Sequence, residues 1–403
     1  MNALVRDRLT PGASLPSDHA AALLVGRAFL PAVGGPVLVR IAGDDLLDLS
    51  KIAPTSSELF DRKDAAAEIR ARSLPRVGSL AAVLANSSTE ARDPAAPWLL
   101  APCDLQAIKA AGVTFVASML ERVIEEQARG DPARADGVRK KIAGIIGDNL
   151  RSVKPGSAEA ARVKEVLQAE GLWSQYLEVG IGADAEIFTK SQPMSAVGTG
   201  ADIGIHRQST WNNPEPEIVL AINSRGETVG ATLGNDVNLR DFEGRSALLL
   251  GKAKDNNASC AIGPFVRLFD RDFTIDAVRQ ADIALDVEGP DGFMLEGSSS
   301  IGEISRDPLD LASQAIGPNH QYPDGLMLFL GTMFAPTRDR HAPGLGFTHE
   351  VGDVVTIATP SLGALVNRVN YADAIAPWTF GAGALMRNLA NRGLLEKGRG
   401  AGD

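Results

Sequence analysis

The chain has 403 residues, of which 44% are hydrophobic and 22% are charged, and its formal net charge at pH 7 is −10. This is the composition of a globular protein, and the length favours two domains. An acidic chain without a cluster of Lys and Arg is a poor partner for nucleic acid, because phosphate contacts need such clusters. The two cysteines, Cys103 and Cys260, are too few for a disulfide scaffold or a cysteine-based zinc site.

Apolar runs in the chain are short. None approaches the roughly 20 residues that a membrane-spanning helix needs. The run at residues 20–25 is also too short for the apolar core of a signal peptide. We therefore expect a soluble, cytoplasmic protein that has no membrane partner.

Residues 1–97 have the pattern of a smaller N-terminal α/β domain. The segment 27–41 alternates and carries β-branched residues, which predicts strands. A Pro- and Ala-rich stretch at 92–97 has the composition of a linker. Because this part carries no motif with chemistry, we predict a support domain, followed by a catalytic domain over residues 98–403.

The second part of the chain begins with helical patterns and then changes character. Helices are expected at 104–129, 135–147, 157–170 and, at the end of the chain, 382–395. Ser157 is a suitable N-cap for the third of them. From about residue 187 to 365 the pattern becomes short strands with glycine turns. A β-rich body with a helical insertion near its start is an α+β arrangement.

Three carboxylates lie close together in the β-rich part. Glu215 and Glu217 are two residues apart at the start of an apolar strand, so their side chains project from the same face. A turn at 223–227 and a returning strand at 228–233 predict a hairpin that brings Asp236 back to the two glutamates. Carboxylate oxygens suit Mg²⁺ or Mn²⁺ better than zinc, so we predict these three residues as ligands of such an ion.

Lys254 follows the three carboxylates in a polar stretch. A lysine that is desolvated beside a metal has its ammonium form disfavoured, which lowers its pKa towards that of a general base. A salt bridge between Lys254 and a ligand carboxylate is an alternative that is compatible with this role. Lys252 is the competing candidate. Arg240 and Asp241 are expected to support the ligand residues by contacting them, without a part in the chemistry.

The motifs of this region resemble those of the fumarylacetoacetate hydrolase superfamily. They are Glu-Pro-Glu at 215–217, Gly-Asn-Asp-Val-Asn-Leu-Arg-Asp at 234–241, and a lysine, Lys254, ten residues before the proline of a Gly-Pro pair. The resemblance covers residues 100–395 and selects Lys254 over Lys252. It implies a rolled, mixed β-sheet body, a β-sandwich roll, around a metal site.

Further segments resemble the sugar-acid dehydratases of this superfamily. They are 110–114, 173–177, 186–190, 211–215, 320–324 and 331–336. The resemblance implies Mg²⁺-dependent dehydration of a 2-keto-3-deoxy-pentonate, such as 2-keto-3-deoxy-D-xylonate, to 2-oxoglutarate semialdehyde in pentose catabolism. It also implies a homodimer or homotetramer.

Other residues are expected to meet the substrate. The resemblance makes Glu186 a fourth acidic residue, as a ligand or as a general acid/base beside Lys254, and it places Thr359 near the substrate. Ser118 and Arg122 share a helix face, and an arginine suits a carboxylate or sugar hydroxyls. His320 lies in a polar loop and is expected at the mouth of the site. Lys254 is counted among the substrate contacts as well.

Decarboxylase and isomerase activities of the superfamily share the ligand set and stay open as alternatives. Two other functions compete with dehydration. The first is metal-dependent hydrolysis of a C–C bond in a diketo acid, which needs a base to activate water. In hydrolases of the family this base is commonly a His paired with an acidic residue, and His206, nine residues before Glu215, has no obvious acidic partner beside it. The second is a sugar-acid binding protein without catalysis, against which the intact acidic set and Lys254 argue.

Overall fold

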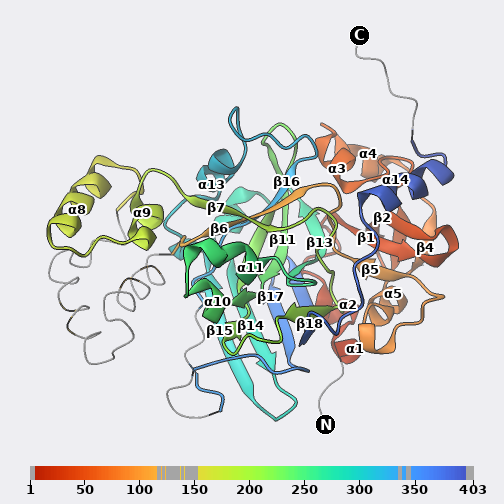
Figure 1. Cartoon of the computed structure of the whole chain (residues 1–403). Helices are drawn as coiled ribbons and strands as arrows, with labels where there is room; N and C mark the ends of the chain where they lie inside the picture. The colour runs from red at the N-terminus through yellow and green to blue at the C-terminus, as the bar shows by residue number, and fades with distance from the viewer. Residues whose placement is uncertain are drawn as a thin grey trace.

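The protein consists of a layered β-rich body with a helical projection at one end (Figure 1). In this computed structural model the residues described are 5–115, 119, 123, 137, 140, 153–334, 338–341 and 346–395. None of the helices in these ranges is long and apolar enough to cross a bilayer.

The larger sheet of the described chain has 11 strands. In spatial order they are β4 (Arg76–Ser79), β3 (Asp45–Asp48), β2 (Gly35–Ala42), β1 (Leu24–Leu30), β13 (Cys260–Leu268), β11 (Thr228–Asp236), β10 (Pro216–Ile222), β16 (Leu326–Phe329), β6 (Ala107–Gly112) and β7 (Glu186–Ser191), and β5 (Trp98–Leu100) pairs with β1. The sheet is mixed, because β16 and β6 run parallel while its other neighbouring strands run antiparallel.

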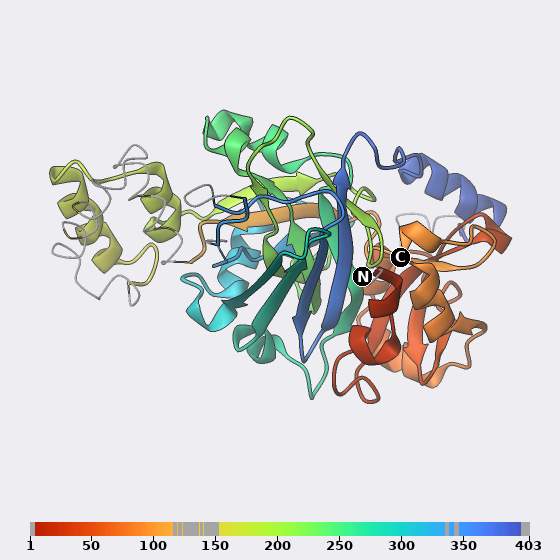
Figure 2. The same cartoon turned by 90° about the horizontal axis from the view of Figure 1, so that it is seen from below.

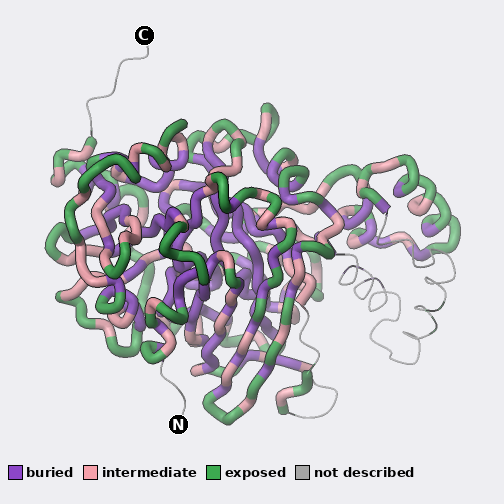
Figure 3. Tube along the Cα trace, turned by 180° about the vertical axis from the view of Figure 1, so that it is seen from behind, coloured by how far each residue is buried: buried purple, intermediate pink, exposed green. Residues whose placement is uncertain are grey.

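A second sheet packs against the first. Its 5 strands, in spatial order, are β15 (Met294–Ser300), β14 (Asp282–Glu288), β17 (Val354–Thr359), β18 (Gly363–Tyr371) and β8 (Asp202–Ile205). A small ladder joins β9 (Asn212–Asn213) to β12 (Asn238–Leu239). Figure 3 shows the buried strands at the centre of the body.

The helices lie around these sheets. Their bounds are α1 (Val5–Arg8), α2 (Pro11–Ser14), α3 (Ser56–Asp61), α4 (Ala65–Ala71), α5 (Leu80–Asn86), α8 (Ala158–Ala169), α9 (Gln175–Ile181), α10 (Arg240–Glu243), α11 (Leu250–Lys254), α12 (Ile275–Arg279), α13 (Pro308–Ala315) and α14 (Ala382–Asn391), with short 3-10 turns at η1 (Pro31–Val33), η2 (Thr89–Ala91), η4 (Ala247–Leu249) and η5 (Ile301–Glu303).

Strand β10 shows why the centre of the body is so well buried. Its alternate residues Ile218 and Leu220 enter the core between the two sheets. Val219 and Ala221 enter a second core on the opposite face of the large sheet. A strand that is covered on both faces is apolar along its length, and β10 is buried at every position. The only carboxylate within it, Glu217, is therefore buried as well, with 2% of its surface exposed.

The predicted hairpin is confirmed. Strands β10 and β11 are antiparallel, and their register places Glu217 opposite Gly234. The turn predicted at 223–227 separates them, with N–H of Asn223 donating to the carbonyl of Glu227. The predicted N-cap is confirmed as well, since the Ser157 hydroxyl accepts from N–H of Ala160 at the start of α8.

One of the predicted helices is wrong at its beginning. The segment predicted as helix at 104–129 contains strand β6, which pairs with β16 on one side and with β7 on the other. Two strand partners outweigh the helical preference of the alanine-rich sequence Ala-Ile-Lys-Ala-Ala-Gly. Nearly all of the helix predicted at 135–147 lies outside the described residues.

The two ends of the molecule differ in how they join the body. The N-terminal strands β1–β4 continue the large sheet through the pairing of β1 with β13, so residues 1–97 share a sheet with the strands that carry the acidic residues. At the opposite end, α8 and α9 stand between β6 and β7 in the sequence and project from the body (Figure 2). The position of a domain boundary at residue 97 stays a prediction.

Candidate metal centre

The three carboxylates predicted as ligands come together in the structure. One oxygen from each of Glu215, Glu217 and Asp236 lies within 4.8 Å of the others. Hydrogen bonds from backbone N–H groups hold the three carboxylates in place. N–H of Asp236 donates to the carbonyl of Glu215 over 3.1 Å. Oε2 of Glu217 accepts from N–H of Gly331 over 2.6 Å. The cluster is thus built from the hairpin and from the loop after β16.

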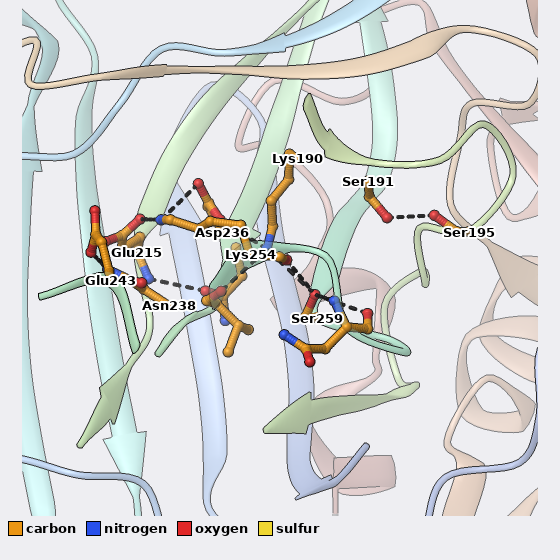
Figure 4. Close-up of polar contacts among 12 residues, drawn as sticks. Lys190, Ser191, Ser195, Glu215, Asp236, Asn238, Glu243, Lys254 and Ser259 are labelled. Carbon is orange, nitrogen blue, oxygen red and sulfur yellow. Dashed lines mark hydrogen bonds and ion pairs between the residues drawn. The ribbon is translucent and has the colours of Figure 1, made fainter. Parts of the chain in front are cut away.

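Two lysines contact the cluster from different elements (Figure 4). Nζ of Lys254, at the end of α11, lies 2.5 Å from Oε2 of Glu215 and 3.1 Å from Oδ2 of Asp236. Nζ of Lys190, on β7, lies 2.9 Å from Oδ1 of Asp236, and its side chain is 0% exposed. Lys190 was not among the predicted site residues.

Burial and mutual repulsion dominate the electrostatics of the cluster. Burial, with the neighbouring Asp236 and Glu215, raises the pKa of Glu217 well above its usual value. Burial also raises the pKa of Glu215. For Lys254 burial acts in the direction expected from the sequence and lowers the pKa, but the charges of Asp236 and Glu215 outweigh it, so that the pKa is raised overall. The protein groups alone therefore shift the pKa of Lys254 in the direction opposite to the one expected beside a metal.

The residues present fit a divalent cation. The three carboxylates, two of them buried and Glu215 partly exposed, outnumber the two ammonium groups of Lys254 and Lys190. Buried carboxylates are stable only when they are paired or coordinate a metal. Oδ1 of Asp236 is buried and accepts no hydrogen bond, although Lys190 lies close to it. An all-oxygen donor set suits Mg²⁺ or Mn²⁺. The three residues predicted as ligands thus lie together in the fold, in a place that suits such an ion.

A pocket of about 360 Å³ opens over the cluster. Its polar wall includes the three carboxylates, Lys254 and Glu186, the first residue of β7. Glu186 lies across Gly112 of β6, where a Cβ would come within 2.1 Å of Oε2 of Glu186. The glycine thus leaves room for the carboxylate, and the structure brings Glu186 into the same pocket as the cluster, as predicted.

The short helix α10 adds two charged residues to the pocket: Arg240, which was expected only to support the ligands, and Glu243, which was not predicted. Glu243 lines the pocket, and Nδ2 of Asn238 donates to Oε2 of Glu243 over 2.6 Å and to Oε1 of Glu215 over 2.9 Å. Arg240 also lines the pocket, with its guanidinium 4.3 Å from the Trp211 ring. The sequence offered no signal for Glu243, since its place beside Glu215 depends on the hydrogen bonds that both accept from Asn238.

The remaining predicted residues lie elsewhere or cannot be placed. Thr359 is buried at the end of β17 in the second sheet, and His320 is exposed between α13 and β16. Neither is among the described residues that line the pocket. Ser118 and Arg122 lie outside the described residues. Asp241 accepts from the Ser209 hydroxyl and from N–H of Thr210, and so holds the loop before β9.

Comparison with known proteins gives related sequences. No protein-family model matches the chain. It is 32% identical over 184 residues to the 2-dehydro-3-deoxy-D-arabinonate dehydratase of Saccharolobus solfataricus, covering 46% of this chain and 58% of that protein. It is 29% identical over 212 residues to a probable 2-keto-3-deoxyxylonate dehydratase of Haloferax volcanii, covering 53% of this chain and 68% of that protein. The chain therefore matches only part of the length of these relatives.

Solved structures share the architecture. A 2-keto-3-deoxy-D-arabinonate dehydratase complexed with magnesium and 2,5-dioxopentanoate superposes with a TM-score of 0.60 at 20% identity, covering 86% of this chain and 99% of that one. The fumarylacetoacetate hydrolase from Exiguobacterium antarcticum superposes with a TM-score of 0.51 at 16% identity, covering 87% of this chain and 100% of that one. The chain therefore has the fumarylacetoacetate hydrolase fold. The sequence relatives are named as dehydratases of keto-deoxy sugar acids, which confirms the resemblance to such dehydratases.

Proposed function

We propose that the protein is a Mg²⁺-dependent hydro-lyase that dehydrates a 2-keto-3-deoxy-pentonate. The observation that carries the proposal is the buried cluster of Glu215, Glu217 and Asp236 beneath a pocket that also contains Lys254 and Glu186. Its sequence relatives are named for dehydration of such acids. We propose 2-keto-3-deoxy-D-xylonate as the substrate and 2-oxoglutarate semialdehyde as the product, with Mn²⁺ as an alternative ion.

The chain's residues have distinct tasks in this reaction. Glu215, Glu217 and Asp236 would hold the ion, which when bound supplies positive charge that stabilises the negative charge developing on the substrate oxygens. Lys254 is fixed by two of these carboxylates and keeps an ammonium charge at the floor of the pocket. Lys190 holds Asp236 from the other side.

Proton transfer falls to Glu186 in this proposal. Lys254 donates to Glu215 and Asp236, whereas Glu186 comes from a different strand and lines the pocket beside them. Glu186 removes a proton from C3 of the substrate and returns it to the hydroxyl group on C4, which leaves as water. The product of this step has a C3–C4 double bond and still carries the C5 hydroxyl. Transfer of a proton from C5 to C3 then gives the C4–C5 enol, and protonation of C4 with loss of the enol O–H proton gives the aldehyde.

The hydrolase alternative is less well supported. Hydrolysis of a C–C bond needs a base that activates water, and no histidine is among the described residues that line the pocket. His206 lies edge-on to Phe242, 5.2 Å between ring centroids, and its Nδ1 accepts from N–H of Gln208. These contacts of His206 are with residues that do not line the pocket.

The N-terminal residues and the assembly complete the proposal. None of the described residues in 1–97 lines the pocket, which supports a structural role for this part of the chain. We propose that the protein is a homodimer or homotetramer. Light scattering at several concentrations tests the assembly, and a monomer at all concentrations contradicts it.

Turnover of 2-keto-3-deoxy-D-xylonate with Mg²⁺ tests the function, with the semialdehyde detected through a coupled dehydrogenase. We expect turnover that EDTA abolishes and that Glu217→Gln reduces by about a thousandfold or more. The matched control is Glu227→Gln, because Glu227 is exposed at the turn of the same hairpin. Equal activity of the two variants contradicts the proposal.

A further inference from the structure

Helix α9 forms a wall of the pocket although it belongs to the projecting insertion. Gln175, Tyr176 and Val179, all from this one helix, line the pocket with the acidic cluster. Tyr176 and Val179 are half-buried, and Gln175 is exposed. The side chain of Ser174 begins the helix by accepting from N–H of Leu177. The first turn of α9 is therefore fixed, with a phenol and an amide beside the pocket.

Helix α9 lines the same pocket as the cluster but contributes none of its charged groups. The carboxylates come from the β10–β11 hairpin, Lys254 ends α11 and Lys190 lies on β7, whereas α9 supplies Gln175, Tyr176 and Val179. A short-chain keto acid whose carboxylate end lies at the cluster meets α9 with another part of its chain.

The buried side chain of Arg306 connects the C-terminal end of α9 to the β-rich body by hydrogen bonds. Nη2 of Arg306 donates to the carbonyls of Val179 and Gly182, each over 2.8 Å, and to that of Asp184 over 3.2 Å. The Arg306 side chain is 2% exposed. A guanidinium at a helix C-terminus satisfies carbonyls that lack a partner and opposes the negative end of the helix dipole.

The residues just before Arg306 contact the segment at which the chain enters the insertion, Thr114 and Phe115. N–H and the hydroxyl of Ser305 both donate to the carbonyl of Thr114, each over 2.8 Å. Ile304 forms an isolated bridge with Phe115. The residues 304–306 therefore hold both chain connections of the insertion, so α9 is positioned by the body of the protein.

We propose that α9 is the specificity wall of the site, where Tyr176 donates a hydrogen bond to the hydroxyl at the end of the substrate far from the carboxylate cluster. Gln175 is a second polar contact from the same helix turn, and Arg306 is a positioning residue that sets the distance of this wall. This inference rests on the proposed function. It adds which end of the substrate the protein recognises, and that helix α9 recognises it.

The test compares two substrates that differ only at this end. 2-Keto-3-deoxy-D-xylonate carries a hydroxyl on C5, and 4-hydroxy-2-oxopentanoate has the same reacting atoms without that hydroxyl. We expect Tyr176→Phe to lower kcat/KM for the pentonate about tenfold, the effect of one lost hydrogen bond, and to change that for the analogue less than about twofold. Glu178→Gln is the matched control on the same helix, because the exposed Glu178 contacts Lys164 and Trp173 outside the pocket.

Arg306 is tested by Arg306→Gln and Arg306→Lys. We expect Arg306→Gln to raise KM for the pentonate about tenfold, with a smaller change in kcat and no change in KM for the analogue. Arg306→Lys restores part of the effect, since an ammonium reaches fewer of the three carbonyls than the planar guanidinium. A merely structural role would lower kcat for both substrates together through loss of folded protein.

The outcomes separate the two proposals. If the wild type converts neither substrate, the proposed function is wrong and the inference falls with it. If the wild type converts the pentonate and Tyr176→Phe affects both substrates equally or neither, the proposed function stands and α9 is not the specificity wall.

Discussion

Replacing Lys190 by methionine tests how the protein tolerates a buried carboxylate cluster. Nζ of Lys190 lies 2.9 Å from Oδ1 of Asp236 and donates to the carbonyl of Val237 over 3.2 Å, at a side chain that is 0% exposed. Removing one partner of a buried ion pair costs about 3–5 kcal/mol, because the other charge is left without compensation. With an unfolding entropy of about 2.1 cal/mol/K per residue, this cost lowers Tm by about 4–6 °C for a chain of 403 residues.

The assay is thermal unfolding of metal-free protein in EDTA, followed by titration with Mg²⁺. We expect Mg²⁺ to raise Tm more in Lys190→Met than in the wild type, since the variant carries one more uncompensated negative charge. The control is Lys252→Met, because Lys252 is exposed on α11 and its loss is expected to shift Tm by less than about 1 °C. Equal Tm values for the two variants would refute the role that we assign to the buried ammonium.

Three further predictions concern the metal, its neighbours and acid stability. Calorimetry should show one Mg²⁺ bound per chain, and saturation at about a hundred times Kd should add about 2.7 kcal/mol to the free energy of unfolding; no heat of binding would contradict the ligand set. Gly331→Ala should weaken Mg²⁺ binding about tenfold or more by calorimetry, because Gly331 has φ 87°, holds Glu217 through its N–H, and a Cβ would lie 2.1 Å from Oγ1 of Thr114. A Kd equal to that of the wild type would contradict this account of Gly331. For Asp353, burial raises the pKa, but hydrogen bonds from His349 and Arg340 outweigh it and leave the pKa below the usual 3.8. Its stabilisation is therefore present above that value and lost as the pH falls through the folded pKa, so the Tm difference between wild type and Asp353→Asn should shrink below about pH 4; a difference that grows in acid would contradict the sign.

The sequence predicted that the three carboxylates come together because the spacing of these residues is local. Glu215 and Glu217 share a strand face, and one hairpin turn returns Asp236 to them, so the strand period and turn chemistry were sufficient. Lys254 was predicted from its place in the motif. Its pKa direction was not, because that depends on which carboxylates surround it in the fold.

Other parts depend on contacts between distant segments. Lys190 follows Thr189 in the chain, and only the packing of β7 against α11 and β11 makes it a buried partner of Asp236. Strand β6 looked helical because its alanines favour a helix, whereas its pairing with β16 joins residues more than two hundred positions apart. The role of α9 likewise needs Arg306, which lies far along the chain from it.

The most direct test of the central claim identifies the product of 2-keto-3-deoxy-D-xylonate incubated with the protein and Mg²⁺, with a parallel sample in EDTA. Carbon NMR distinguishes the two reaction classes, because dehydration keeps the five carbons in one molecule and C–C cleavage divides them. We predict 2-oxoglutarate semialdehyde as the single product, formed only with the metal. Pyruvate as the product, or semialdehyde formation undiminished by EDTA, would contradict the account.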